Sequence, residues 1–273
     1  MHTARSVVLS TVDAGIAVVT LNRPDSLNAM SADLMETLRE CLLAASEDSD
    51  VRCVVLRGAG TSFCAGGDIN EIAERQAQTT ESSSPGATTE RYHRTLIRHS
   101  ESVTLLRTMP KPTIAAVHGW AVGGGMSLAL AADFRLVARG ARMRAGFASN
   151  SLSGDFGISS LLLRAVGTLR ARELLMLDPV IDSSMAEMLG LATLVCEDDE
   201  MEAELKRFAG SLASAPTIAL GRMKDNLNLA ETHTLTEVIA AESANQRVTA
   251  NTSDAHEAAR ARATRREARF TGQ

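Results

Sequence analysis

The sequence predicts an α/β fold in its first half and an almost wholly helical second half. Two observations carry this prediction. Short runs rich in β-branched residues alternate with stretches of helical apolar spacing as far as Ala138, and from Ser159 onward the apolar spacing is helical nearly throughout. A chain of 273 residues can bury one large core, with or without a small appendage.

The strand signals come first. Four short β-rich runs bounded by turn residues are expected to form strands, at 16–21, 51–56, 113–117 and 134–138. Between the first two, residues 31–47 predict a helix, because Leu34, Leu38 and Leu42 recur at helical spacing and Ser31 is a suitable N-cap. A further helix, rich in Ala and Leu, is expected to end near Ala132.

The second half predicts seven helices, at 159–166, 170–177, 183–189, 200–214, 216–228, 235–249 and 254–265. We divide the chain into a core at 1–205 and a C-terminal helical region at 206–273. Residues 76–90 are polar, rich in Ser and Thr, and nearly devoid of large apolar groups. Such a segment cannot offset its ordering entropy by burial, so we expect a mobile rim over the site.

The charge balance excludes some functions. A net charge of −5 and a pI near 5.7 argue against nucleic-acid binding, which normally needs a basic face. The tail nevertheless concentrates positive charge at Arg260, Arg262, Arg265, Arg266 and Arg269. This cluster is either a solvated helix face or a docking site for an anionic group such as a phosphate.

Cysteine usage and hydropathy bear on the compartment. The four cysteines form no CxxC pair and no metal-ligand spacing, which suits a reducing compartment, and no metal site is expected. No basic segment followed by an apolar run opens the chain, and the longest apolar stretch, 126–132, is too short to cross a bilayer. We therefore expect a cytoplasmic protein without a membrane anchor.

Two glycine-rich turns carry the chemistry. Residues 62–69 and 118–127 each follow a predicted strand and open a helix. Such a unit exposes unpaired backbone N–H groups where the helix dipole favours negative charge. One turn alone can be purely structural. Two on neighbouring strands can direct two amides at one oxygen, the geometry of an oxyanion hole.

These motifs identify the chain as similar to the crotonase (enoyl-CoA hydratase/isomerase) superfamily. The resemblance rests on SFCAGGDI, KPTIAAVHGWAVGGGMSLALAADFRL, LNRPDSLNAM and EAARARATRREARFTG, and it covers nearly the whole chain. It implies a spiral of ββα units, a helical C-terminal trimerisation region, and a homotrimer or a hexamer built as a dimer of trimers. It also implies that the thioester carbonyl of an acyl-CoA lies between the amides of Gly67 and Gly124. The chemistry then proceeds through an enolate, with no metal and no redox cofactor.

The resemblance also assigns the coenzyme A contacts. They are Asp25, Ser26, Leu27, Ala65, Asp68 and Ile69. Arg265 is the best match for a basic tail residue that binds a CoA phosphate, commonly from a neighbouring subunit, which favours the docking interpretation of the tail. The aromatic residue often found three positions earlier in the family is replaced by Arg262.

The choice of reaction depends on the acidic residues. Typical hydratases of this family use two glutamates, and the matching positions here are Ser127 and Phe147. Serine is a poor general base without a partner, and phenylalanine cannot transfer protons. Standard two-glutamate hydration is therefore not expected. Asn150 and Ser127 could instead hold a water or the substrate tail.

Asp155 stands where isomerase members of the family, including dienoyl-CoA isomerases and ring 1,2-epoxyphenylacetyl-CoA isomerases, carry a catalytic carboxylate. One carboxylate above an enolate is enough for a double-bond shift, and an apolar pocket beside Phe147 would raise its pKa. The alternative is that Asp155 caps the helix beginning near Ser159 or serves the adjacent turn.

Other polar residues have simpler interpretations. His118 is expected to be packed or hydrogen-bonded, Asp68 to cap the helix it opens, and Trp120 to pack beside its turn. Tyr92 and His93 could reach the acyl pocket but are more typical of surface residues. The sequence thus favours an isomerase using Asp155, with a hydratase of unusual residues and a silent acyl-CoA-binding protein as alternatives.

Overall fold

The strands form one main sheet and one small sheet in a computed structural model that describes residues 6–81 and 85–273. The main sheet has the order β1-β2-β3-β4-β6-β9 and consists of Val8–Asp13, Ile16–Leu21, Cys53–Gly58, Thr113–Val117, Phe134–Ala138 and Leu194–Cys196. β1 and β2 are antiparallel, whereas every later pair is parallel. The small sheet joins β5 (Trp120–Val122), β7 (Arg142–Arg144) and β8 (Ile181–Asp182). The predicted α/β class is confirmed.

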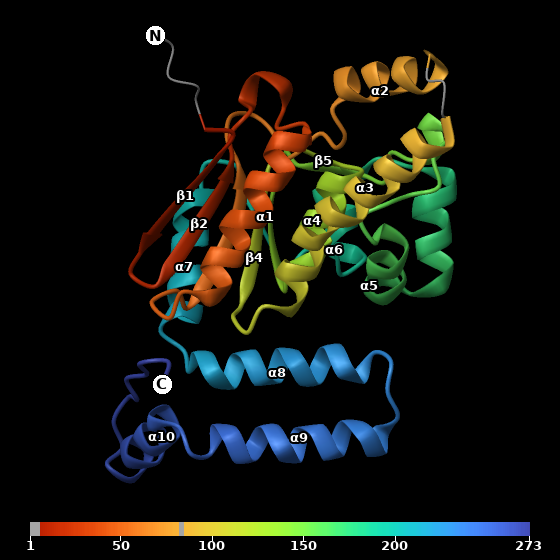
Figure 1. Cartoon of the computed structure of the whole chain (residues 1–273). Helices are drawn as coiled ribbons and strands as arrows, with labels where there is room; N and C mark the ends of the chain where they lie inside the picture. The colour runs from red at the N-terminus through yellow and green to blue at the C-terminus, as the bar shows by residue number, and fades with distance from the viewer. Residues whose placement is uncertain (1–5, 82–84) are drawn as a thin grey trace.

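Helices cover both faces of the main sheet (Figure 1). On one face lie α1 (Ala32–Glu47) and α4 (Gly124–Ala131), and every residue of α4 is buried. On the other face, α7 (Met201–Ala213) places Leu205, Ala209 and Ala213 against strand residues such as Ile114. Ser31 caps α1 through its hydroxyl, which accepts a hydrogen bond from the Leu34 amide at 3.2 Å, as predicted.

The segment at 76–90, expected to be a mobile rim without regular structure, is helical in the residues that the structure describes there. α2 (Ile69–Glu81) runs through the first part of the segment and α3 (Pro85–Thr108) through the last, while 82–84 lie outside the described residues. Helix hydrogen bonds are local, so a polar stretch can extend a helix that begins or ends in a packed segment without burying much apolar surface. α3 supplies that packing with Val103 and Leu106, which are buried against the core.

A kink marks the first predicted helices of the second half. α5 (Ile158–Arg172) contains Gly167 in a non-helical conformation (φ 73°, ψ 174°), which matches the expected break between 166 and 170. η3 (Glu173–Leu177) continues α5 as a π-helix, and α6 (Ser183–Met188) follows β8. The 3-10 turns η1 (Pro24–Ser26) and η2 (Ala148–Asn150) both lie in loops beside the site described below.

The last three helices form a separate layer. α8 (Thr217–Ala230), α9 (Leu235–Thr249) and α10 (Ser253–Ala263) lie at the end of the molecule opposite α2 and β5 (Figure 1). The proposed boundary at residue 205 falls inside α7, a helix that packs on the sheet. None of the described helices is long and apolar enough to cross a membrane.

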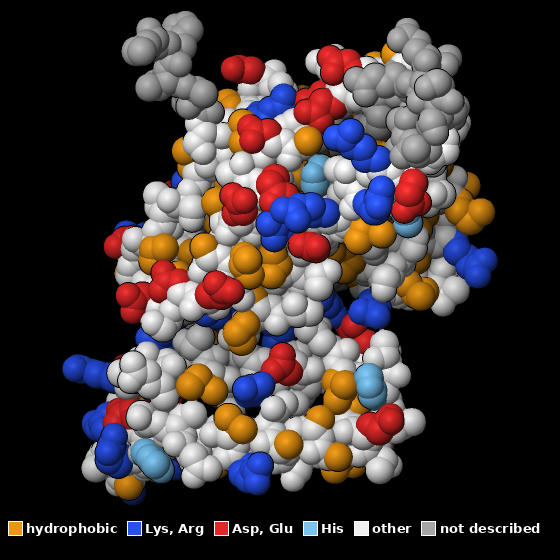
Figure 2. Space-filling view, in the orientation of Figure 1, with side chains coloured by type: hydrophobic (Ala, Val, Ile, Leu, Met, Phe, Trp, Pro, Cys, Tyr) orange, Lys and Arg blue, Asp and Glu red, His pale blue; other side chains and the backbone are white. Residues whose placement is uncertain are grey.

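A buried lysine and a half-buried arginine attach this layer to the core. Lys224 on α8 donates to Asp133 Oδ2 at 2.8 Å and to the Leu106 carbonyl at 2.8 Å. Arg52 donates to the Ala215 and Phe270 carbonyls at 2.6 and 3.0 Å. Hydrophobic side chains nevertheless remain exposed over α8 and α9 (Figure 2), and the exposed set includes Met223, Leu227, Leu235 and Ile239.

Candidate active site

The two glycine turns lie in direct contact. The Cys64 amide donates to the Trp120 carbonyl and the Val122 amide to the Cys64 carbonyl, both at 2.9 Å, so the first turn pairs like a strand with β5. A Cβ on Gly66, whose φ is +89°, would lie 2.8 Å from the Val122 carbonyl oxygen. Only glycine permits this approach of backbone to backbone.

The predicted oxyanion-hole amides are both available. Gly67 follows a turn that is held by the Met30 amide, which donates to the Gly66 carbonyl at 2.7 Å. Gly124 is the first residue of α4, where backbone N–H groups have no partner within the helix. Within the described part of the chain, neither amide donates a hydrogen bond. Two unpaired amides on touching turns, one at a helix N-terminus, can stabilise a negatively charged oxygen.

Asp155 lies close to these turns. Its neighbour Phe156 is buried, and the Phe156 ring comes within 3.4 Å of the Cβ position of Gly124. The Asp155 side chain is half-buried, and among the described residues it makes no hydrogen bond or ion pair. Burial raises the pKa of this carboxyl, with no opposing donor to stabilise the charge.

The capping interpretation of Asp155 is wrong for this structure. α5 begins at Ile158 after Gly157, and no side chain caps it. Asp155 serves the turn only through its backbone carbonyl, which accepts the Ile158 amide at 3.1 Å. The carboxylate itself therefore remains available for chemistry.

Ser127 and Phe147, at the two glutamate positions, are both buried. Ser127 is fully buried, and its hydroxyl donates to the Gly123 carbonyl one turn earlier at 3.4 Å. Phe147 is buried, with its ring 3.9 Å from the Cβ position of Gly123. Asn150 is exposed and donates to the Gly146 carbonyl at 2.7 Å. All three belong to the loop or helix beside the second glycine turn, and their contact with substrate stays a prediction.

The residues expected to hold coenzyme A gather at one mouth of the site. η1 exposes Asp25, Ser26 and Leu27, and the Leu27 carbonyl accepts the Ala65 amide at 3.0 Å. Ile69 is 79% exposed at the start of α2. The structure thus brings the LNRPDS loop and the first glycine turn together, an arrangement compatible with a nucleotide lying across both.

Asp68 caps α2, as the sequence indicated. Its carboxylate accepts the amides of Asn70 and Glu71 at 3.1 and 3.5 Å, and it pairs with Arg23 Nη1 at 2.7 Å. The hydrogen bond from the Arg23 guanidinium, with help from the backbone amides, lowers the pKa of Asp68. Arg23 also donates to the Ala29 carbonyl at 2.6 Å, so this pair ties the LNRPDS loop to the first turn.

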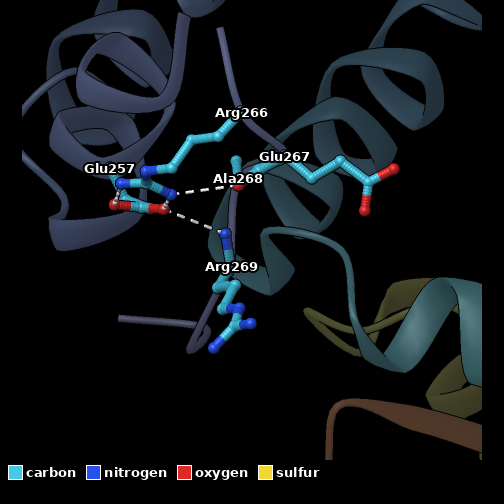
Figure 3. A pocket seen from close by; sticks show the side chains of 5 residues that line it. All are labelled: Glu257, Arg266, Glu267, Ala268 and Arg269. Carbon is cyan, nitrogen blue, oxygen red and sulfur yellow. Dashed lines mark hydrogen bonds and ion pairs between the residues drawn. The ribbon is translucent and has the colours of Figure 1, made fainter. Parts of the chain in front are cut away.

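The basic tail lies far from the glycine turns of its own chain. Arg265 is exposed directly after α10, at the end of the molecule opposite β5 (Figure 1). Figure 3 shows the groove beside it, lined by Glu257, Arg266, Glu267, Ala268 and Arg269. There Arg266 pairs with Glu257 at 2.5 Å, whereas the Arg269 side chain points away from that pair. A CoA contact by Arg265 would have to reach another subunit.

The remaining candidates lie as follows. His118 Nε2 is 3.1 Å from the Gly60 carbonyl oxygen, which confirms its hydrogen-bonded role. Tyr92 and His93 are exposed on α3, and Trp120 is 38% exposed on β5.

Sequence reasoning missed a buried carboxylate, Asp178, which accepts the amides of Gly146 and Ser149 beside the second turn. No motif marks it. Its only local signal is its place just after a helix.

The comparisons with known proteins agree with this geometry. The enoyl-CoA hydratase/isomerase family model matches residues 11–273. The chain is 35% identical to 1,2-epoxyphenylacetyl-CoA isomerase of Escherichia coli strain K12 over 265 residues, covering 97% of this chain and 98% of that one. It is 32% identical to crotonyl-CoA hydratase of Syntrophomonas wolfei over 214 residues, or 78% of each chain.

A solved structure supports the same assignment. The crystal structure of an enoyl-CoA hydratase from Polaromonas sp. JS666 superposes with a TM-score of 0.88 at 31% identity, covering 97% of this chain and 99% of that one. The chain therefore belongs to the enoyl-CoA hydratase/isomerase family, the crotonase superfamily, as its motifs indicated.

Proposed function

We propose that this protein is an acyl-CoA isomerase that shifts a double bond by means of Asp155. The thioester oxygen accepts hydrogen bonds from the Gly67 and Gly124 amides, which lowers the energy of the enolate. Asp155 breaks one C–H bond by taking the proton, the electron pair enters the enolate, and the carboxyl returns the proton to a different carbon. No water is consumed, and no metal or redox cofactor enters the step.

The observation that carries the proposal is the environment of Asp155. An unpartnered, half-buried carboxylate lies beside Phe156, whose ring contacts the oxyanion-hole turn. Its raised pKa suits a group that must both accept and return a proton near neutral pH. The likeness to 1,2-epoxyphenylacetyl-CoA isomerase over nearly the whole chain supports an isomerase as well.

The alternative is a hydratase in which Asp155 alone guides water. The likeness to a crotonyl-CoA hydratase favours this alternative. Two observations at the glutamate positions oppose it. The Ser127 hydroxyl is buried and already bonded to the Gly123 carbonyl, and Phe147 occupies the other glutamate position, so a second acid–base group is absent at both places.

The test offers purified protein 3-enoyl-, 2-enoyl- and dienoyl-CoA thioesters and identifies the products. Asp155→Asn is assayed alongside. The control is Asp198→Asn, because the Asp198 carboxylate accepts the Gly140 amide at 2.8 Å and no other hydrogen bond from the residues that the structure describes. We expect double-bond migration that Asp155→Asn reduces by about 10²-fold or more and Asp198→Asn leaves intact.

Two other outcomes decide against the proposal. Hydration that survives Asp155→Asn would support the hydratase and remove Asp155 from the mechanism. Tight binding of the thioesters with no turnover of any would support a protein that only binds acyl-CoA.

A further inference from the structure

The second glycine turn is supported from outside by the loop after β7. The Gly123 amide donates to the Arg144 carbonyl at 3.0 Å. The Ala145 carbonyl oxygen and the Phe147 ring lie 3.7 and 3.9 Å from the Cβ position of Gly123. Residues 144–149 therefore form the surface against which this turn rests, and a shift of that loop would move the residue that precedes Gly124.

One buried side chain holds this loop. Asp178 Oδ1 accepts the Gly146 amide at 2.7 Å, and Oδ2 accepts the Ser149 amide at 3.3 Å. Arg144 closes the arrangement, because its Nη2 lies 3.2 Å from Asp178 Oδ2 and its Nε donates to the Asp178 carbonyl at 3.1 Å. Three points of the loop are thus attached to one residue, which is 6% exposed.

Asp178 also adopts an uncommon backbone conformation. Asp178 ends η3 in the left-handed region, with φ +52° and ψ +46°. Glycine is the residue most favoured in that conformation after a helix. Aspartate is tolerated there as well, but its carboxylate is buried against two amides and a guanidinium, which indicates a role for the carboxylate beyond ending the helix.

We propose that Asp178 is a positioning residue of the oxyanion hole. Its carboxylate fixes the 144–149 loop, the Arg144 carbonyl then fixes the Gly123 amide, and Gly124 is held where its own amide meets the thioester oxygen. Arg23 and Asp68 form the corresponding pair at the first turn. The inference rests on the proposed function of the Gly67 and Gly124 amides, since it concerns the position of one of them.

The test separates thioester binding from coenzyme A binding. Dissociation constants are measured for acetoacetyl-CoA and for free CoA, which has no thioester oxygen. Asp178→Gly keeps the left-handed backbone and removes the carboxylate, and Asp178→Asn keeps a carbonyl oxygen that can accept one amide. The matched control is Asp198→Gly, which removes a carboxylate that accepts the Gly140 amide just before β7 begins.

We expect Asp178→Gly to weaken acetoacetyl-CoA binding by about tenfold or more while leaving the Kd of free CoA unchanged, because a displaced donor stabilises the oxygen less well. Turnover of the enoyl substrate should show a fall in kcat larger than any rise in KM. Asp178→Asn should recover part of both losses, and Asp198→Gly should show neither. If Asp178→Gly fails to fold, Asp178→Asn provides the same comparison.

Three results would overturn the inference in different ways. Unchanged kcat and unchanged preference for acetoacetyl-CoA in both folded variants would show that Asp178 only ends a helix. An equal loss of affinity for both ligands would show that Asp178 affects the binding of the CoA moiety and not the thioester oxygen. If the wild-type protein binds acetoacetyl-CoA no more tightly than CoA, the Gly67 and Gly124 amides do not form an oxyanion hole. The proposed function would then fail together with this inference.

Discussion

At the scale of single residues, Asp155 is the group on which the proposed reaction depends. It is half-buried, it has no partner among the described residues, and it does not cap α5. A carboxylate in that position opposes folding when ionised, because burial removes water without supplying a donor. Stability and activity therefore make opposite demands at this residue.

Asp155→Asn should reduce activity by about 10²-fold or more without destabilising the fold. Burial raises the folded-state pKa of Asp155, so the native protein binds the proton more tightly than the unfolded chain does. Stability is then lost as the pH rises from about 3.9 through the folded pKa. At pH 7 the neutral asparagine escapes this loss, and chemical denaturation should show an unchanged or larger free energy of unfolding. A capping role would instead make Asp155→Ala cost about 1 kcal/mol, because alanine supplies no acceptor for the helix amides.

The pH dependence of turnover gives a second prediction for the same residue. Asp155 must be ionised to take a proton, so kcat/KM should fall as the pH falls through its pKa. Because burial raises that pKa, the acidic limb should lie above the ordinary aspartate value of about 3.9. A profile that stays flat down to that value would rule out Asp155 as the base.

Sequence reasoning named candidate site residues but not the residue that supports them. The glycines and the Asp68 cap are marked by local motifs, and Asp155 by the family resemblance. The structure brings the two glycine turns together and places Phe156, the neighbour of Asp155, against Gly124. Asp178 has no local motif, because its partners Gly146 and Ser149 lie far back along the chain. The sequence also does not predict that the Ser127 hydroxyl bonds to the Gly123 carbonyl, because this depends on the close packing around α4.

At the scale of elements, the site depends on how closely two strand–turn–helix units approach. A Cβ on Gly125 would lie 2.4 Å from the Cys64 carbonyl oxygen and 2.7 Å from the Cys64 Cβ. Backbone and buried side chain cannot yield there as a flexible surface side chain could. The first turn of α4 is therefore placed by this contact.

Gly125→Ala should separate the two turns and reduce kcat by about 10²-fold or more, since displacing one oxyanion donor has about that effect. Steady-state kinetics on the folded variant would measure it. Gly210→Ala is the matched control, because a Cβ on this glycine of α7 meets nothing within 4 Å. That control should leave kcat unchanged and stabilise the helix slightly. Equal kcat in both variants would contradict the account.

Elements with strong periodicity were predicted well, and those set by tertiary pairing were not. The helix at 235–249 matches α9, and the strand at 113–117 matches β4. The short strands β7 and β8 form through pairing with distant segments, which no local sequence pattern reveals. β1 is exposed beyond Val8, so its sequence lacks the apolar residues by which a strand is predicted. The helical ends of α2 and α3 were not predicted, because their polar composition suggested a loop. Each polar stretch instead continues a helix whose other part is less polar.

At the scale of the whole molecule, the layer of α8, α9 and α10 presents apolar side chains outward. Leu227 is 69% exposed and Leu235 75% exposed. Exposed apolar residues gathered on two adjacent helices indicate a protein contact. They fit the trimer or hexamer that the family resemblance implies, in which Arg265 could reach the site of a neighbouring chain.

Light scattering after size exclusion should therefore give the mass of a trimer or hexamer, not that of a single 29.0 kDa chain. Leu227→Glu should lower this mass by placing a charge in the contact. Leu9→Glu, at a leucine on β1 that is 45% exposed, should not change it. A wild-type protein that runs as a monomer would contradict the expected assembly and the role of Arg265 with it.

The central claim is that an enolate forms between the two glycine turns and that Asp155 moves the proton. Exchange of the α-hydrogens of a bound acyl-CoA with D₂O, followed by NMR, tests it most directly. The account predicts catalysed exchange by the wild type and its loss in Asp155→Asn, with the Kd for the acyl-CoA retained. Undiminished exchange in Asp155→Asn, or none in the wild type, would contradict it.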